Sequence, residues 1–161
     1  MMMMGIVVTL PVLLTEVERL RLGGKKIVTT NGCYDLMHTG HLRYLQAAKA
    51  LGDVLIVAVN ADSSVRGLKG DLRPVVNEND RAELLAGLAC VDYVVIFSGE
   101  TPLPELQAIR PDIHVKGGQY TEETLPEAPV LKALGCQLAF IEMVANRSTT
   151  QLIEKIIRAY T

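Results

Sequence analysis

Two patterns of apolar residues alternate along the chain from Thr15 onward. Short, nearly continuous apolar runs are typical of strands buried on both faces of a parallel sheet, and they predict strands at residues 26–30, 53–60, 93–97, 113–116 and 137–141. Between these runs the apolar positions recur every three or four residues. This spacing predicts helices from Thr15 to Gly23-Gly24, at 41–51, from Asn77 or Asn79 to Cys90, and at 102–109, 126–134 and 148–160. The polar segment 61–76 is expected to be a loop. In the last helix, the side chains expected to face the core are Leu152, Ile153, Ile156 and Ile157.

This alternation predicts a single Rossmann-like α/β domain, with an open, mostly parallel five-stranded sheet and helices on both of its faces. The domain is expected to span residues 15–161, after an N-terminal leader of uncertain structure at residues 1–14. The leader is apolar, but it lacks a basic region, Pro11 interrupts it and it is too short to cross a bilayer. We therefore expect neither an export signal nor a membrane partner. In sheets of this kind, ligands bind at the carboxyl ends of the strands, where the strand order reverses.

The composition narrows the possible classes of function. Apolar residues make up 49% and charged residues 21% of the 161 positions, which excludes a disordered, collagen-like or coiled-coil chain. A net charge of −2 gives no global positive field, aromatic residues make up only 4% and Trp is absent, so we expect no nucleic-acid partner. The widely spaced Cys33, Cys90 and Cys136 are typical of thiols in a reducing cytosol, and we expect a cytoplasmic protein.

The strongest chemical signal lies between the first buried strand and the first long helix, at residues 30–41. Gly32 permits a tight turn after the strand, and Gly40 has no side chain that would keep a phosphate away from the helix. His38 and His41 are three residues apart at the helix start, so both rings can point toward one ligand. The unpaired N–H groups and the positive end of the helix dipole add an anion site there. The two histidines do not indicate a zinc site, because no third ligand lies at the usual offset from them. The segment is not a Walker A loop either, because the spacing G-x-x-x-x-G-K-[ST] is missing.

The tetrad His38-Thr39-Gly40-His41, directly ahead of a helix, resembles the signature of the cytidylyltransferase-like nucleotidyltransferase superfamily. A second signature of that superfamily opens the last helix as Ser148-Thr149-Thr150, although Ser or Thr is also an ordinary helix N-cap. The resemblance covers residues 25–160, nearly the whole chain. Within the superfamily, the segments that resemble the bacterial D-glycero-β-D-manno-heptose 1-phosphate adenylyltransferases are residues 68–74, 79–81 and 115–120.

The resemblance implies transfer of AMP from ATP to the heptose 1-phosphate, which gives ADP-heptose for lipopolysaccharide core biosynthesis and releases pyrophosphate. It implies catalytic roles for His38, His41 and Lys69. The nucleotide-binding residues that it implies are Thr30, Asn31, Gly32, Cys33, Tyr34, Gly40, Lys116, Gly117, Arg147, Ser148, Thr149 and Thr150. The sugar-phosphate-binding residues that it implies are Asp35, Asp62, Lys69, Arg73 and Arg81. It also implies a homodimer, and Mg²⁺ held through phosphate oxygens and water near Asp35 rather than by a direct protein cage.

This reaction makes limited demands on the protein. A phosphate monoester is already an anion near neutral pH, because its second pKa is about 6, so no general base is required. The site should instead supply positioned donors and cations that stabilise charge on the α-phosphate and the leaving group. Sequence alone leaves other interpretations open: Lys69 as a solvated surface lysine, Asp35 as a turn-capping carboxylate, and Arg81 as the partner of Asp80 or Glu78.

Other functions also remain open. The glycerol-3-phosphate cytidylyltransferases carry an Arg five residues before the Ser of the last signature, where this chain has Met143. That difference disfavours their activity and leaves the role of Arg147 undecided. The further alternatives are another sugar- or alcohol-phosphate nucleotidyltransferase of the superfamily, and a nucleotide-binding sensor without turnover. The sequence does not distinguish adenine from cytosine, nor one sugar phosphate from another.

Overall fold

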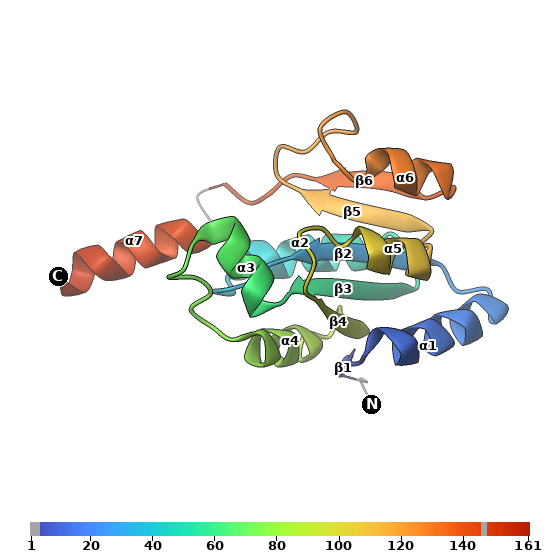
Figure 1. The fold of residues 1–161 in the computed structure, drawn as a ribbon, viewed down its shortest axis with the longest axis horizontal. Helices are drawn as coiled ribbons and strands as arrows, with labels where there is room; N and C mark the ends of the chain where they lie inside the picture. Colours follow the sequence, from blue (N-terminus) through green and yellow to red (C-terminus); the bar gives the residue numbers. More distant parts are fainter. Residues whose placement is uncertain (1–3, 146–147) are drawn as a thin grey trace.

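The structure is a computed structural model that describes residues 4–145 and 148–161 (Figure 1). Its strands are β1 (Ile6–Val7), β2 (Ile27–Gly32), β3 (Val54–Asn60), β4 (Tyr93–Phe97), β5 (Ile113–Gly117) and β6 (Gln137–Ile141). Its helices are α1 (Leu10–Leu22), α2 (Thr39–Lys49), α3 (Asp62–Lys69), α4 (Glu78–Ala86), α5 (Leu103–Ile109), α6 (Ala128–Ala133) and α7 (Thr149–Tyr160). The strands form one parallel sheet in the order β1-β4-β3-β2-β5-β6, which confirms the Rossmann-like α/β fold with six strands in place of five. Within the described ranges, no helix has the length and apolarity needed to span a bilayer.

The additional strand comes from the segment that was expected to be a leader, since β1 pairs with β4 at one edge of the sheet. The first helix, α1, begins at Leu10, with Thr9 at the N-cap position, so the expected start at Thr15 was wrong. Pro11 does not interrupt this segment. Proline is well accommodated in the first turn of a helix, where its missing N–H would have had no intrahelical partner.

A second difference lies in the segment 61–76, which was expected to be a loop throughout. Residues 62–69 form α3, in which the buried residues are Ser64 and Val65. With only eight residues, few of them apolar, α3 leaves a short pattern in the sequence, and Gly67 lowers its helix propensity further. The remaining expected helices and strands are confirmed, with small displacements at their ends.

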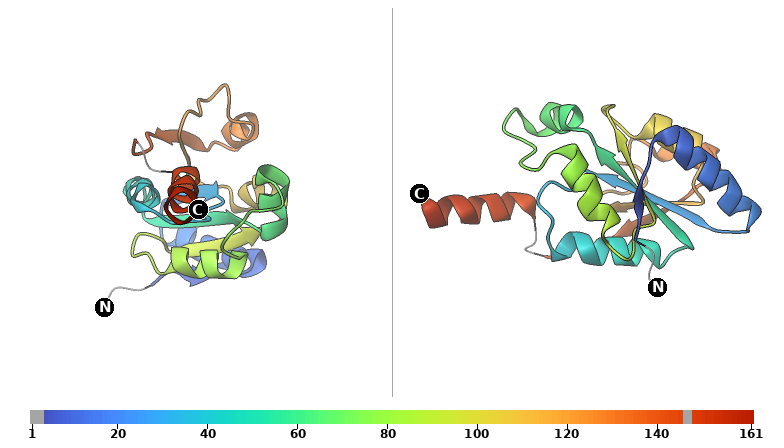
Figure 2. Two further views of the ribbon diagram at one scale, coloured as in Figure 1. Left: turned by 90° about the vertical axis from the view of Figure 1, so that its left-hand side faces the viewer. Right: turned by 90° about the horizontal axis from the view of Figure 1, so that it is seen from below.

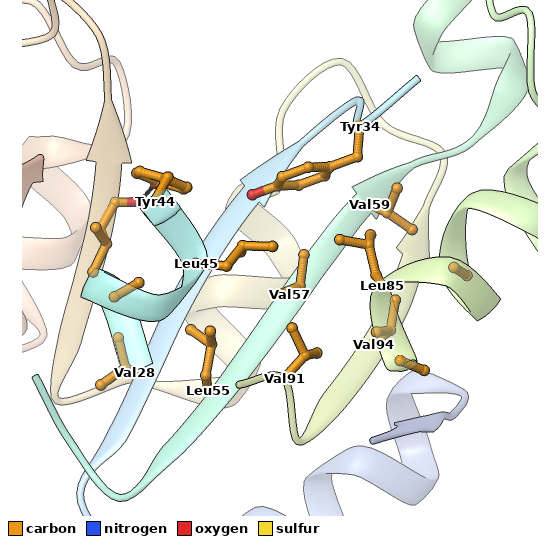
Figure 3. Packing of buried hydrophobic residues seen from close by; sticks show 14 of the residues in the cluster. Val28, Tyr34, Tyr44, Leu45, Leu55, Val57, Val59, Leu85, Val91 and Val94 are labelled. Carbon is orange, nitrogen blue, oxygen red and sulfur yellow. Dashed lines mark hydrogen bonds between the residues drawn. The ribbon is translucent and has the colours of Figure 1, made fainter. Parts of the chain in front are cut away.

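Hydrophobic clusters hold helices on both faces of the sheet. On one face, Leu45 of α2 and Leu85 of α4 pack around Val57 of the central strand β3 (Figure 3). On the other face, Leu13 of α1 and Ile109 of α5 belong to a second cluster, which also includes residues of β2, β3 and β4. Burial of this apolar surface on both sides fixes the central strands, so the positions of the segments at the strand ends are determined by the core.

The last helix differs from the expectation in its packing. Figures 1 and 2 show α7 extending away from the rest of the molecule. At its N-terminal end, the Thr149 hydroxyl donates a hydrogen bond to the Leu36 carbonyl at 3.1 Å. No residue of α7 is buried, and Ile156 and Ile157 are each 53% exposed, so the expectation that its four apolar residues face the core was wrong. The amphipathic pattern identifies an apolar face, but it does not determine what the face packs against.

The strand order reverses between β2 and β5, which are neighbours in the sheet. The hydroxyl of Tyr44 on α2 connects them, because it lies 2.6 Å from Thr30 Oγ1 on β2 and donates to the Val115 carbonyl on β5 at 3.0 Å. Open α/β sheets bind ligands at the carboxyl ends of the strands beside such a switch point. The ends of β2 and β5 are therefore where a site is expected.

Candidate functional site

A pocket of about 180 Å³ lies at this switch point. Its walls come from the end of β2 and the turn after it, from α2, from the end of β5, and from segments that follow β5 and β6. The lining residues are Asn31, Gly32, Cys33, Tyr34, His41, Tyr44, Lys116, Gly117, Tyr120 and Met143. The structure thus brings together two segments, 31–41 and 116–117, that the sequence had marked separately as candidate sites.

The two histidines cap α2 at its N-terminus. Nδ1 of His38, the N-cap residue, accepts a hydrogen bond from the Gly40 N–H at 3.1 Å, and Nδ1 of His41 accepts one from the His38 N–H at 3.4 Å. The two rings are stacked, with their centroids 3.9 Å apart. Because Nδ1 is the acceptor in both rings, the proton of each neutral imidazole is on Nε2. The backbone therefore selects the tautomer of both side chains, and each ring has a donor at Nε2.

His41 is kept neutral by its surroundings. Its ring is half-buried in the pocket wall and lies beside Tyr34, with ring centroids 5.3 Å apart. Burial, and to a lesser extent the neighbouring His38, lowers the pKa of His41 from 6.5 to about 4. At pH 7 this side chain therefore offers an N–H donor rather than a full positive charge.

Two glycines give the pocket its room. A Cβ on Gly32 would lie 2.9 Å from Cε2 of Tyr34, and a Cβ on Gly117 would lie 2.6 Å from Sδ of Met143 and 3.0 Å from Cε2 of Tyr44. Gly32 is the last residue of β2, so it is required for space beside an aromatic ring and not for the tight turn that was expected of it. Any side chain at either position would push atoms into the pocket or displace its wall.

Lys116 supplies a cation to the pocket wall. Its Nζ donates to Oδ1 of Asn31 at 3.1 Å and lies 4.9 Å from the centroid of the Tyr120 ring. Burial lowers the pKa of Lys116, and the charge of the buried Glu127 acts in the opposite direction. An ammonium held between an amide oxygen and an aromatic face has a defined position at the end of β5.

Asp35 is buried, and it organises the segment before α4. Its carboxylate accepts hydrogen bonds from Nε of Arg73 at 2.5 Å, from the Val75 N–H at 2.8 Å and from the Val76 N–H at 2.9 Å. Burial alone would raise the pKa of Asp35, but these hydrogen bonds lower it below its ordinary value. The carboxylate was expected beside the sugar or Mg²⁺. In the structure it holds protein groups, which is close to the capping interpretation.

Arg81 is completely buried. Its Nη2 donates to Oδ1 of Asp62 at 2.8 Å, its Nη1 to the Cys33 carbonyl at 2.6 Å and its Nε to the Val76 carbonyl at 2.8 Å. Arg81 forms an ion pair, as the alternative interpretation expected. Its partner is Asp62 on α3, however, and not a carboxylate on the helix of Arg81 itself. Since no part of the guanidinium is exposed, we assign Arg81 no contact with a substrate.

Known proteins are similar to this chain in sequence and in fold. The sequence profile of the family described as Cytidylyltransferase-like matches residues 29–155. The chain belongs to this family. It is 50% identical over 145 residues to the "Bifunctional protein HldE" of Syntrophotalea carbinolica, and 52% identical over 136 residues to that of Helicobacter acinonychis. These matches cover 90% and 84% of this chain but 29% and 28% of the relatives, so the chain spans less than a third of their length.

A solved structure is also similar to this cytidylyltransferase-like chain. The crystal structure of the lipopolysaccharide core biosynthesis protein from Thermoplasma volcanium matches with a TM-score of 0.63 and 29% sequence identity, over 75% of this chain and 98% of that protein. The resemblance inferred from the histidine tetrad is therefore confirmed, and membership of the family makes the chain a nucleotidyltransferase.

Several residues expected in the cytidylyltransferase-like site are not part of the pocket lining. Thr30 is buried beneath it, and Lys69 is exposed at the last position of α3. Ser148 caps α7 by accepting a hydrogen bond from the Gln151 N–H at 3.1 Å, while Thr150 is exposed. Arg147 lies outside the described residues. The roles expected for these residues stay predictions.

Three lining residues were missed in the sequence analysis: Tyr44, Tyr120 and Met143. Tyr44 follows His41 by three residues on α2, so helical spacing could have placed both on one side. Tyr120 lies in a segment that was already singled out for its resemblance. Met143 had been noted only for the Arg that it replaces, since its contact with the pocket depends on the path of the chain after β6.

Proposed function

We propose that this domain transfers AMP from ATP to D-glycero-β-D-manno-heptose 1-phosphate, giving ADP-heptose and pyrophosphate for lipopolysaccharide core biosynthesis. The observation that carries the proposal is the pair of backbone-capped, stacked imidazoles at the N-terminus of α2, one of which lines the pocket. The name of the Thermoplasma volcanium protein and the matches to HldE proteins support the pathway. The choice of heptose rests on the resemblance of residues 68–74, 79–81 and 115–120.

In this reaction a phosphate oxygen of the sugar 1-phosphate attacks the α-phosphorus of ATP. A new oxygen–phosphorus bond forms as the bond between the α-phosphorus and its bridging oxygen breaks, and pyrophosphate leaves with that electron pair. The nucleophile is largely a dianion at neutral pH, because the second pKa of a phosphate monoester is about 6. No side chain has to remove a proton, so the protein contributes by positioning the reactants and stabilising charge.

The N-terminus of α2 suits the phosphates of the nucleotide. His38 and His41 would donate hydrogen bonds from Nε2 to oxygens of the α- and β-phosphates, where negative charge increases during the transfer. The dipole of α2 favours an anion at the same place. A neutral imidazole donates without competing for a proton of the substrate, which agrees with the low pKa of His41. Lys69, at the exposed end of α3, would add a mobile cation as the phosphates bind.

The nucleoside would occupy the rest of the pocket, beside Lys116 and the rings of Tyr44 and Tyr120. On the side of the sugar phosphate, Arg73 and Asp62 have side chains that are 18% and 26% exposed, so both can be reached from solvent. We propose them as contacts of the sugar phosphate together with Lys69. Asp35 and Arg81 are buried and bonded to protein groups, so we do not propose them as contacts of the substrate.

Mg²⁺ would accompany the triphosphate and would supply charge neutralisation to its oxygens. The carboxylate of Asp35 already accepts hydrogen bonds from Arg73, Val75 and Val76, so it does not fit as a direct ligand. Phosphate oxygens and water therefore fit the ion better than a cage of side chains.

The test is a pyrophosphate-release assay with four nucleoside triphosphates against several sugar and alcohol phosphates, in the presence of Mg²⁺. We expect release with ATP and the heptose 1-phosphate. Release only with CTP and glycerol 3-phosphate would assign the chain to the cytidylyltransferase alternative, which Met143 disfavours. Binding of ATP without release against any acceptor would indicate a sensor. A homodimer is also proposed, from the family resemblance, and size-exclusion chromatography with light scattering tests it. A cytoplasmic location is proposed from the widely spaced cysteines.

A further inference from the structure

The wall of the pocket contains a strained residue. Tyr34 lines the pocket, it is buried and it has a φ of +49°, in the left-handed region that non-glycine residues seldom adopt. Such a conformation persists only when the surroundings hold it in place. The Tyr34 ring lies beside the His41 ring, with centroids 5.3 Å apart, so the position of Tyr34 bears directly on the burial of that imidazole.

The residues on either side of Tyr34 are anchored, one to α4 and the other to the segment before it. The carbonyl of Cys33 accepts a hydrogen bond from Nη1 of Arg81 at 2.6 Å. The carboxylate of Asp35 accepts hydrogen bonds from Arg73 and from the N–H groups of Val75 and Val76. The strained residue is therefore held between two anchors, one on each side in the sequence.

Arg81 has the largest side chain among the fully buried residues of the described chain. It is on α4, which contributes no residue to the lining of the pocket. Its three hydrogen bonds join the Cys33 carbonyl, the Val76 carbonyl and Asp62 at the start of α3. A planar guanidinium can satisfy acceptors in three fixed directions at once, whereas an ammonium on a flexible stem is a single point of charge. Burying this charge is costly unless it is paired, so its position between the three segments is well determined.

We propose that Arg81 is a positioning residue, which fixes the left-handed turn at Tyr34 and thereby keeps His41 half-buried in the pocket wall. It acts through Cys33 and Tyr34 and touches no substrate. The proposal rests on the proposed function for its consequence in catalysis, but the placement of His41 can be measured without any substrate.

The test is a titration of the histidine ring protons by NMR, in the substitution Arg81→Lys. The chain has three histidines, so their signals can be assigned by single substitutions. In the unsubstituted protein, His41 should remain neutral from pH 8 to pH 5, because its pKa is about 4. In Arg81→Lys we expect the His41 signal to titrate within that range, as water gains access to the ring. His114, which is completely buried in β5, should stay neutral in both and serves as the internal control.

Arg66→Lys is the matched control, since Arg66 is exposed on α3 and undergoes the same chemical change. It should leave the His41 titration unaltered. In turnover, Arg81→Lys should lower kcat by about 10²-fold, because small displacements of a catalytic group can have effects of that size. An unaltered His41 titration in a folded Arg81→Lys protein would overturn the proposal.

If Arg81→Lys does not fold, Asp62→Ala takes its place, since it removes one of the three acceptors and leaves the guanidinium intact. We then expect a smaller rise in the pKa of His41, and no rise would equally overturn the proposal. The readout also separates the two proposals. Absence of pyrophosphate release in the unsubstituted protein would contradict the proposed function, while the response of His41 to Arg81→Lys would still be measurable.

Discussion

The substitution pair His38→Asn and His38→Ala separates the two roles that the structure gives to this side chain. Nδ1 of His38 accepts the Gly40 N–H at the N-cap of α2. The amide oxygen of Asn is among the best N-cap acceptors, so His38→Asn should preserve the cap, whereas His38→Ala removes it. Neither variant has a donor at the position of Nε2. We therefore expect one variant that is stable and inactive, and a second that is both inactive and less stable.

The expected magnitudes follow from the two interactions. Loss of a helix N-cap costs about 1 kcal/mol, so His38→Ala should lower Tm by about 2–4 °C in a domain of this size, and His38→Asn should lower it by less. Loss of one preorganised donor to a developing phosphate charge should lower kcat by about 10²–10³-fold in both variants. Thermal unfolding followed by circular dichroism and pyrophosphate release with saturating substrates measure the two effects. Turnover close to that of the unsubstituted protein in His38→Asn would refute the role of Nε2, and equal Tm values for both variants would refute the cap.

Three further predictions concern the groups around the pocket. Tyr44→Phe removes the hydroxyl between Thr30 and Val115 and leaves two buried groups without that partner, so it should destabilise the fold by about 1–3 kcal/mol in urea unfolding; an unchanged free energy of unfolding would contradict this. Gly117→Ala should weaken nucleotide binding by about tenfold in calorimetry, since overpacking typically costs about 1–3 kcal/mol. Gly87→Ala is the control and should bind the nucleotide normally, because the atom nearest to the added Cβ would lie 3.4 Å away. The pKa of the buried His114 falls from 6.5 to about 3, so the unfolded chain binds the additional proton and stability should decrease as the pH falls from 6.5 toward 3, by about 1.4 kcal/mol per pH unit for this group. His114→Asn should reduce that slope in urea unfolding at a series of pH values, and an equal slope would show that another group is responsible.

The strands were predictable because the sheet is buried on both faces. The run at 93–97 matches the largely buried β4 residue for residue, since a continuous apolar stretch has few other places in a folded domain. The run at 137–141 also matches β6, although this edge strand contains no buried residue. The two-residue strand β1 has an exposed burial pattern and lies within the apolar stretch 1–14, so no separate run marks it as a strand. Its existence depends on pairing with β4, a partner far away in the sequence.

The site shows the same division between local and distant interactions. The capped histidine pair was predictable in outline, because His38 and His41 are three residues apart and the helix starts between them. The hydrogen bonds of Arg81 join it to residues 19 and 48 positions away, so no short window of sequence contains them. The resemblance consequently marked Arg81 as a sugar-phosphate ligand, while its actual neighbours are set by how α3 and α4 pack at the strand ends.

Three of the five tyrosines of the chain, Tyr34, Tyr44 and Tyr120, line the pocket, and the chain contains no Trp. Intrinsic emission excited in the ultraviolet therefore originates mainly at the place where a ligand would bind, without the dominant background that an indole would add. Occupancy could be followed optically in the unlabelled protein, and stopped-flow mixing would then time the arrival of each reactant.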